Sequence, residues 1–243
     1  MRVIHQIQGA DARSFLQGLI TNDVDKAADG LIYAAILTPQ GKYLADFFVF
    51  EKDGVLHIDA AQEIAPSLIQ RLNMYRLRAD VQITPSDLEV RRGTGPAPAG
   101  ALADPRHPAL GWRLYGADGG DDGTDWDAIR VAHCIPETGI ELTPDTFILE
   151  AGFGRLNGVD FKKGCYVGQE VTARMKHKTE LRKGLATVSI TGTAPTGTPI
   201  TAEEKPVGTL FTSAGAQAIA HLRFDRATGP LKAGEARLSY PAD

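Results

Sequence analysis

Cysteine is scarce in this chain, which has only Cys134 and Cys165 among its 243 residues. The two do not form a CxxC pair, so the sequence excludes a disulfide framework and a zinc or iron–sulfur site built from this chain alone. Few cysteines without a disulfide pattern are typical of a reducing compartment. We therefore predict a cytoplasmic protein.

Long apolar runs are also missing, since none approaches the ~20 residues that a membrane span requires. Residues 1–6 lack the apolar core of a signal peptide, so we expect no export, transit or anchoring signal. The hydrophobic content of 43% and the formal net charge of −4 describe an ordinary soluble protein. This balance argues against a strongly basic nucleic-acid binder, and the lack of long apolar runs argues against a membrane as partner.

Three patterns that could indicate a ligand site fail on inspection. The Asp-rich stretch 118–127 resembles a calcium loop, but Gly120 and Ile129 occupy two of the ligand positions. Residues 152–158 have the pattern GxGxxxG instead of the nucleotide-binding GxGxxG. The six histidines are scattered without metal-ligand spacing. We predict no metal site.

The pattern of apolar residues predicts an α+β protein that ends in a small β-barrel. Helices are expected over 11–20, 63–76, 124–134 and 169–177, and strands over 31–37, 44–50, 55–60, 79–84, 111–115, 185–190, 207–212, 216–222 and 236–240. A stretch dense in Gly, Pro and Ala over 93–108 indicates a joint. We predict antiparallel α+β subdomains at 1–92 and 93–182 and a barrel at 183–243.

The most informative stretch is 161–174, with the sequence FKKGCYVGQEVTAR. It places Cys165 between two glycines, after two lysines and before a predicted helix, a setting that favours thiolate chemistry or contact with an anion. Between residues 162 and 183 there are seven Lys or Arg and two Glu, so the segment is basic on an acidic protein. Without further context, Cys165 could equally be a small buried hydrophobe, whereas Cys134 lies in an apolar pattern typical of a core.

Residues 163–170, with the sequence KGCYVGQE, resemble the signature of the YgfZ-type folate-binding proteins, which are relatives of the glycine-cleavage aminomethyltransferase, or T-protein. Residues 9–23, 37–42 and 75–81 match further family segments in the same order. The resemblance covers nearly the whole chain. It implies two ferredoxin-like α+β parts and a barrel around a central folate site, and mitochondrial members of the family assist iron–sulfur cluster maturation.

The resemblance implies a site centred on Cys165, with tetrahydrofolate or a derivative as cofactor. Gln or Glu can address the pterin edge and Lys or Arg the anionic glutamyl tail, while an aromatic ring can stack on the ligand or pack in the core. The expected folate contacts are Lys163, Tyr166, Gln169, Glu170, Arg174 and Asp46. A plain solvated helix start with one Glu170/Arg174 pair is the competing interpretation.

One departure from the family bears on activity. In the aminomethyltransferases, a Gly-Gly-x-x-Asp-Asp segment supplies the acidic residue at the reactive end of folate, whereas residues 41–46 here have the sequence GKYLAD. Ala45 replaces one carboxylate and Asp46 keeps the other. Proton handling at the reacting centre needs such a group, so this change counts against aminomethyl transfer.

The leading hypothesis is a folate-binding accessory protein that supports maturation or repair of iron–sulfur enzymes, with assembly proteins or client enzymes as partners. The alternative is a folate-dependent aminomethyl or one-carbon transferase, so enzymatic turnover is left open. A third hypothesis, docking of RNA on the basic segment 162–183, is disfavoured by the net acidity and by the lack of interleaved aromatic residues.

Overall fold

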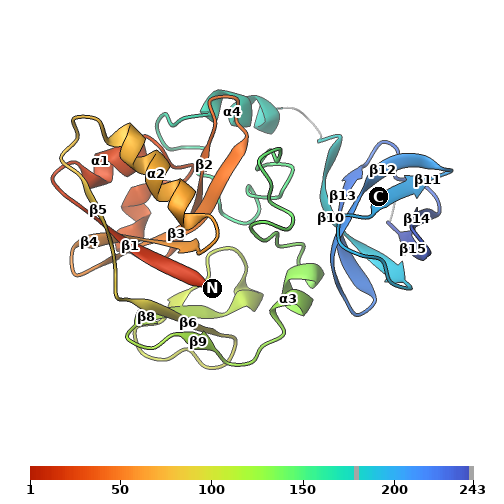
Figure 1. Ribbon diagram of the computed structural model, residues 1–243, viewed down its shortest axis with the longest axis horizontal. Helices are drawn as coiled ribbons and strands as arrows, with labels where there is room; N and C mark the ends of the chain where they lie inside the picture. The colour runs from red at the N-terminus through yellow and green to blue at the C-terminus, as the bar shows by residue number, and fades with distance from the viewer. Residues whose placement is uncertain (178–180, 241–243) are drawn as a thin grey trace. The chain divides into compact units, whose positions relative to one another are not determined.

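The computed structural model describes residues 1–177 and 181–240 (Figure 1). Lys178 and Glu180 of the basic segment lie outside the described residues. The chain forms two compact units, one from 1–124 and 153–173, the other from 125–152 and 174–243. No helix among the described residues is long and apolar enough to cross a membrane. The predicted division at residues 92 and 182 stays a prediction.

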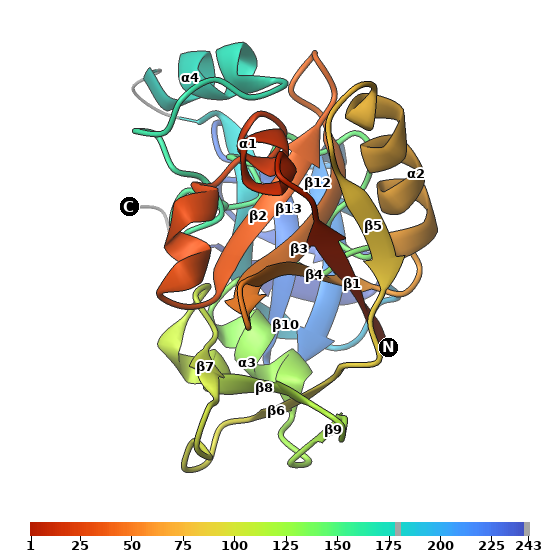
Figure 2. The same cartoon turned by 90° about the vertical axis from the view of Figure 1, so that its left-hand side faces the viewer.

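The first unit is built on a five-stranded antiparallel sheet with the order β2-β3-β4-β1-β5. Its strands are β1 (Arg2–Gln8), β2 (Ile32–Leu37), β3 (Tyr43–Lys52), β4 (Val55–Ala61) and β5 (Gln82–Pro85). The helices α1 (Ala12–Gln17), η1 (Val24–Ala28) and α2 (Ala65–Arg76) lie beside it (Figure 2). Apolar side chains of α1, η1 and α2 share one core with the sheet, including Leu16, Val24 and Leu68.

The side chains of strand β3 are buried on both faces of this sheet. Because successive side chains in a strand alternate between faces, Ala45, Phe47 and Val49 enter the helix-covered core. Asp46 and Phe48 point to the opposite face and are also buried. The second face is therefore covered as well, which the alternation alone would not indicate.

The same unit contains a smaller sheet with the order β7-β8-β6-β9. Its strands are β6 (Glu89–Gly93), β7 (Leu102–Ala103), β8 (Trp112–Gly116) and β9 (Gly120–Asp121), and η2 (Pro108–Leu110) precedes β8. Arginines from this region and from β1 surround the buried ring of Phe48. The guanidinium carbons of Arg113, Arg106 and Arg2 lie 4.0, 4.8 and 5.1 Å from its centroid.

The second unit contains a closed six-stranded barrel with the order β10-β13-β12-β11-β14-β15. Its strands are β10 (Lys183–Thr191), β11 (Pro199–Ala202), β12 (Lys205–Ala214), β13 (Gln217–Arg223), β14 (Leu231–Ala233) and β15 (Ala236–Ser239). Helix α3 (Trp126–Ala132) begins at Asp125, whose carboxylate accepts from the Ala128 amide at 3.0 Å. Cys134 is buried against Val131 and Ile219 of this unit, as predicted for a core cysteine.

The α+β class and the C-terminal barrel are confirmed, and α4 (Gln169–His177) has the predicted bounds. Strand β1 was not predicted. It carries polar residues such as His5 and Gln6, and it is a strand because β4 and β5 pair with it on both sides. The short strands β11 and β14 were missed for the same reason, since each is defined by its partners in the closed barrel.

Candidate functional site

The loop that carries Cys165 starts from a turn built by Asp160. Its Oδ1 accepts from the amides of Lys162 and Lys163 at 2.6 and 3.1 Å, and its Oδ2 accepts from Lys26 Nζ at 2.6 Å. Partial burial raises the pKa of Asp160, but the bonds from Lys26 and the two amides outweigh it, so the pKa lies below its usual range. The turn is thus held by an ionised carboxylate.

Lys163 turns inward and fastens the loop to the end of α1. Its Nζ donates to the carbonyl oxygens of Gln17, Ile20 and Asn22 at 2.8, 2.6 and 2.9 Å. An ammonium group has three N–H bonds, and all three are used here. Burial lowers the pKa of Lys163 to about 8, against the opposing pull of Asp23 and Asp160. The geometry gives Lys163 an anchoring position and leaves no N–H for a folate carboxylate.

Cys165 is exposed, although the nearest side chains before and after it in the sequence are buried. Lys163 and Tyr166 on either side are 7% and 8% exposed, and the Lys163 Nζ lies 5.3 Å from the Tyr166 ring centroid. Burial raises the pKa of Tyr166. A Cβ placed on Gly164 would meet nothing within 4 Å. The loop therefore presents a thiol to solvent from a fixed backbone, because its neighbours are anchored inside the protein.

Two glycines bring this loop against the turn between β2 and β3. Gly168 has a φ of +84°, and a Cβ on it would lie 2.6 Å from the Thr38 carbonyl oxygen. Gly41 has a φ of +75°, and its Cβ would lie 2.7 Å from the Cβ of Val171. Both positions need glycine for backbone conformation and for space. The close approach fixes the start of α4 directly after Cys165.

Helix α4 carries three of the predicted folate contacts. Gln169 turns back toward the loop, and its Nε2 lies 3.4 Å from the Gly164 carbonyl oxygen. Glu170 and Arg174 are exposed. Their amide, carboxylate and guanidinium groups can hydrogen-bond a polar ring edge or an anionic tail. Their role in folate binding stays a prediction.

Asp46 lies on the second face of the main sheet with both carboxylate oxygens engaged. Tyr33 and Tyr43 donate their hydroxyl groups to it at 2.9 and 2.6 Å. Burial and the Asp46 charge raise the pKa of Tyr33 well above its usual range. Ala45, where the aminomethyltransferases have a carboxylate, points to the opposite face and packs in the apolar core. The two positions of that acidic pair therefore lie on different sides of the sheet.

A buried ionic cluster on this second face was not predicted. Asp59 accepts from Tyr115 Oη at 2.8 Å and pairs with Arg113 at 3.4 Å and with Arg2. Asp104 accepts from Arg113 and Arg106, and these arginines overcome the effect of burial and hold its pKa well below its usual range. The members come from β1, β4, β8 and the segment before η2. The only local signal was an aspartate inside a buried strand, Asp59.

Three comparisons place the chain among known proteins. Residues 182–242 match the family model "CAF17, C-terminal beta-barrel domain". The mitochondrial iron–sulfur cluster assembly factor IBA57 of Homo sapiens is 32% identical over 95% of this chain and 78% of that protein, and its Mus musculus counterpart is 29% identical over 98% and 80%. An IBA57 homologue of Mycosarcoma maydis is 32% identical over 80% of this chain, which spans 57% of that protein's length.

A solved structure has the same fold. The glycine cleavage system aminomethyltransferase T from Bartonella henselae superposes with a TM-score of 0.74 at 12% sequence identity, covering 98% of this chain and 81% of that one. The likeness shows the fold alone at this identity, and it confirms the aminomethyltransferase-like architecture predicted from the motif.

The predicted cytoplasmic location is contradicted, because the relatives from H. sapiens, M. musculus and M. maydis are named as mitochondrial proteins. The prediction relied on two features. Scarce cysteines report a reducing environment without naming the compartment. The lack of a targeting signal in residues 1–6 does not indicate the compartment, since the chain covers only part of each relative.

Proposed function

The chain belongs to the family of the iron–sulfur cluster assembly factor IBA57, and we propose from this membership that it takes part in the assembly of iron–sulfur clusters. One observation carries the proposal at residue level. The signature loop exposes the Cys165 thiol while Lys163, Tyr166 and Gly168 around it are anchored in the protein. A fixed, accessible sulfur suits a ligand or a redox group better than a packing role.

The number of accessible cysteines determines how this chain could bind an iron–sulfur cluster. Iron–sulfur clusters are usually held by four thiolates, and this chain offers one accessible cysteine, because Cys134 is buried in a separate apolar cluster. Cys165 would therefore act together with sulfur ligands from a partner. The partner is an assembly protein or a client enzyme that carries or receives the cluster.

We also propose that the chain binds tetrahydrofolate or a derivative, which would supply a one-carbon carrier next to the thiol. The donor chemistry fits in part. Lys163 and Asp46 have their polar atoms occupied by the protein itself. Helix α4 carries the amide of Gln169 and, on exposed side chains, the carboxylate of Glu170 and the guanidinium of Arg174. These three groups would meet a pterin edge or a glutamyl carboxylate.

The alternative, a folate-dependent one-carbon transferase, has less support. The carboxylate that the aminomethyltransferases use near the reacting centre is replaced by Ala45, which is 1% exposed in the apolar core. The remaining Asp46 accepts two tyrosine hydroxyls. A carboxylate occupied in this way is poorly placed to take a proton from a substrate.

Two measurements test the proposals separately. Expression of this chain in cells that lack their own IBA57 relative should restore the activity of iron–sulfur enzymes, and no restoration by a stably expressed chain would refute the assembly role. Titration of tetrahydrofolate, with and without an aminomethyl donor, should show binding without methylene-tetrahydrofolate. Sustained product would favour the transferase, and absence of binding would remove folate from the account.

A further inference from the structure

The segment before the exposed cysteine, residues 157–163, is fastened to Thr21, which lies between α1 and η1. The Thr21 hydroxyl donates to the carbonyl oxygen of Gly158 at 2.6 Å and accepts from the amide of Ala35 at 2.9 Å. The Thr21 amide donates to the Ala35 carbonyl oxygen at 2.9 Å, and the Thr21 carbonyl oxygen accepts from the Asp160 amide at 3.0 Å. Thr21 is fully buried, and these bonds join the segment to β2.

Asn22 holds the same segment at two further points. Its Nδ2 donates to the carbonyl oxygens of Tyr33 and Asn157, both at 2.8 Å, and its Oδ1 accepts from the Asp23 amide at 2.8 Å. Its carbonyl oxygen is one of the three that accept from Lys163 Nζ. An asparagine amide has two N–H donors, and both are used here. Asn22 therefore ties the segment to the sheet at both of its ends.

The backbone of this segment is bent where these bonds hold it. Asn157 has a φ of 54°, a left-handed conformation that asparagine adopts more readily than most residues but still at a cost. Gly158 follows it, and a Cβ there would lie 2.5 Å from Cδ1 of Phe153. The bend and the close approach need contacts that fix them, and the bonds from Thr21 and Asn22 supply these contacts.

Thr21 and Asn22 interrupt an apolar stretch in order to make these contacts. Ile20 and Val24 pack in the core of the first unit, and Thr21 and Asn22 between them are also buried. Burial of a hydroxyl or an amide is unfavourable unless its hydrogen bonds are made, so apolar side chains would fill this space more simply. The two polar side chains give a directional link instead, and the link runs to the segment before the thiol.

This link determines where the Cys165 sulfur lies. Cys165 follows Lys163 by two positions, directly after the held segment. Its side chain is exposed, so the sulfur is placed by the backbone and not by packing of the side chain itself. The groups of a functional site have to lie within about 0.5 Å of their productive positions. The bonds that hold residues 157–163 therefore bear on what the thiol can do.

We propose that Thr21 and Asn22 are positioning residues for the Cys165 thiol, which they hold at the place where the sulfur ligands of a partner meet it. This role rests on the function proposed above for Cys165 in cluster assembly. Both residues are buried, so they act through the segment 157–163 and not by contact with the partner or the cluster.

Thr21→Val and Thr21→Ser separate positioning from packing. Valine keeps the shape of threonine without the hydroxyl, whereas serine keeps the hydroxyl and both of its hydrogen bonds. In the full chain, the hydrogen–deuterium exchange of peptides from 158–168 is compared with that of peptides from β4. We expect Thr21→Val to speed exchange in 158–168 about tenfold or more while β4 changes by less than about threefold, because loss of a buried hydrogen bond frees the segment locally. Thr21→Ser should exchange like the parent.

Function is read in the same variants, as restoration of iron–sulfur enzyme activity at equal protein levels in cells that lack their own IBA57 relative. Thr21→Val should lose most of the restored activity, and Thr21→Ser should keep it. Asn22→Ala removes the bonds to Tyr33 and Asn157 but keeps the carbonyl oxygen that accepts from Lys163. It is the second variant if Thr21→Val does not fold, and the same changes in exchange and restoration are expected.

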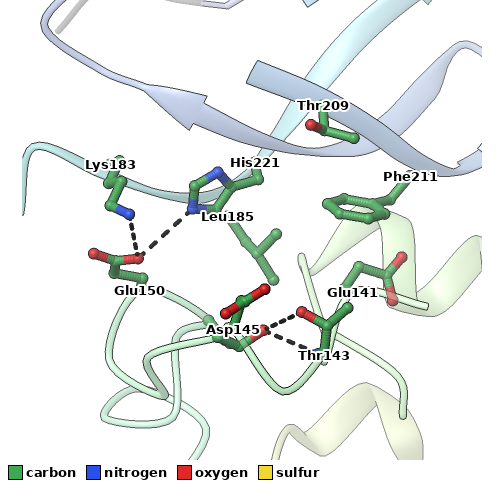
Figure 3. A pocket seen from close by; sticks show the side chains of 11 residues that line it. Glu141, Thr143, Asp145, Glu150, Lys183, Leu185, Thr209, Phe211 and His221 are labelled. Carbon is green, nitrogen blue, oxygen red and sulfur yellow. Dashed lines mark hydrogen bonds and ion pairs between the residues drawn. The ribbon is translucent and has the colours of Figure 1, made fainter. Parts of the chain in front are cut away.

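Two threonines of the second unit provide controls. Thr187 donates its hydroxyl to the Val131 carbonyl oxygen at 2.7 Å, so Thr187→Val removes a hydrogen bond within that unit. Thr209 lines the pocket shown in Figure 3, and its hydroxyl makes no hydrogen bond to the described part of the chain, so Thr209→Val tests the exchange of side chains alone. Both variants should leave hydrogen exchange over 158–168 and the restoration as in the parent.

Parent-like exchange over 158–168 in Thr21→Val would overturn the proposal. A rise shared equally by β4 would also overturn it, because Thr21 would then contribute to global stability only. Restoration equal to that of the parent despite faster exchange would do the same. If the parent chain restores no activity, the assembly role fails, and the exchange still decides whether Thr21 and Asn22 hold the segment before the thiol.

Discussion

The Nζ atom of Lys163 lies 2.6 Å from the carbonyl oxygen of Ile20, which precedes it by 143 positions in the chain. This bond and its two companions, to Gln17 and Asn22, connect the cysteine loop to the end of α1. They explain why a lysine stands directly before the glycine and cysteine of the signature. It positions the thiol instead of binding a ligand.

Lys163→Met tests this anchoring. The substitution leaves three carbonyl oxygens without their donor, and we expect the free energy of unfolding to fall by about 2–4 kcal/mol. The exposed Lys162 offers a matched control, since Lys162→Met should change the free energy of unfolding by less than about 0.5 kcal/mol. The denaturant midpoints of the two variants are compared, and equal midpoints would show that the hydrogen bonds of Lys163 do not contribute to stability.

Gly168→Ala and Gly164→Ala separate a required glycine from a permissive one. Gly168 has a positive φ and no room for a Cβ, so we expect its substitution to destabilise the protein by about 2–4 kcal/mol. Gly164 has open space, and its substitution should cost less than about 1 kcal/mol. Thermal unfolding of both variants is the measurement. A Gly168→Ala variant as stable as Gly164→Ala would contradict the close contact with Thr38.

Ala45→Asp restores the acidic pair of the aminomethyltransferases in sequence, and we expect it to damage the fold without creating activity. Position 45 faces the apolar core, and an unpaired carboxylate there should cost about 3 kcal/mol or more. Melting temperature and formation of methylene-tetrahydrofolate are measured on the same preparation. A stable variant that gains product formation would revive the transferase hypothesis.

The free energy of unfolding should depend on pH through Asp160, which holds the turn before Cys165. An unfolded aspartate titrates near pH ~3.9, while the pKa of Asp160 in the folded protein is lower. The unfolded chain binds more protons in that window, so this contribution is present above about pH 4 and is lost as the pH falls through the folded pKa. The stability difference between the parent and Asp160→Asn should therefore shrink from about pH 6 to about pH 3. A constant difference would mean that Asp160 titrates normally.

Much of the fold follows from local sequence patterns. The apolar residues over 44–50 and 55–60 predicted β3 and β4, and the helix predicted over 169–177 has the bounds of α4. Short or polar strands did not follow, because β1 depends on a partner distant in sequence and β14 has only three residues. The exposure of Cys165 could be anticipated only from the motif, since a lone cysteine is buried as often as not.

The roles of charged residues were harder to predict. Lys163 looked like an anion contact in sequence, and its carbonyl partners at 17–22 are some 140 positions away. Asp46 looked like a ligand contact, and the hydroxyl of Tyr33 reaches it across neighbouring strands. Neither arrangement has a local signature. The sequence therefore indicates which residues carry chemistry better than it indicates what they contact.

The account depends most on the Cys165 sulfur, and Cys165→Ser tests it directly. The side chain is exposed, so the substitution should leave the melting temperature and folate affinity near those of the parent. Cys134→Ala serves as the control, because it removes the buried cysteine, and it should lower stability while leaving function intact. The measurement is iron–sulfur enzyme activity in cells lacking their own IBA57 relative. We predict restoration by Cys134→Ala and none by Cys165→Ser, and full restoration by Cys165→Ser would contradict the proposed thiol chemistry.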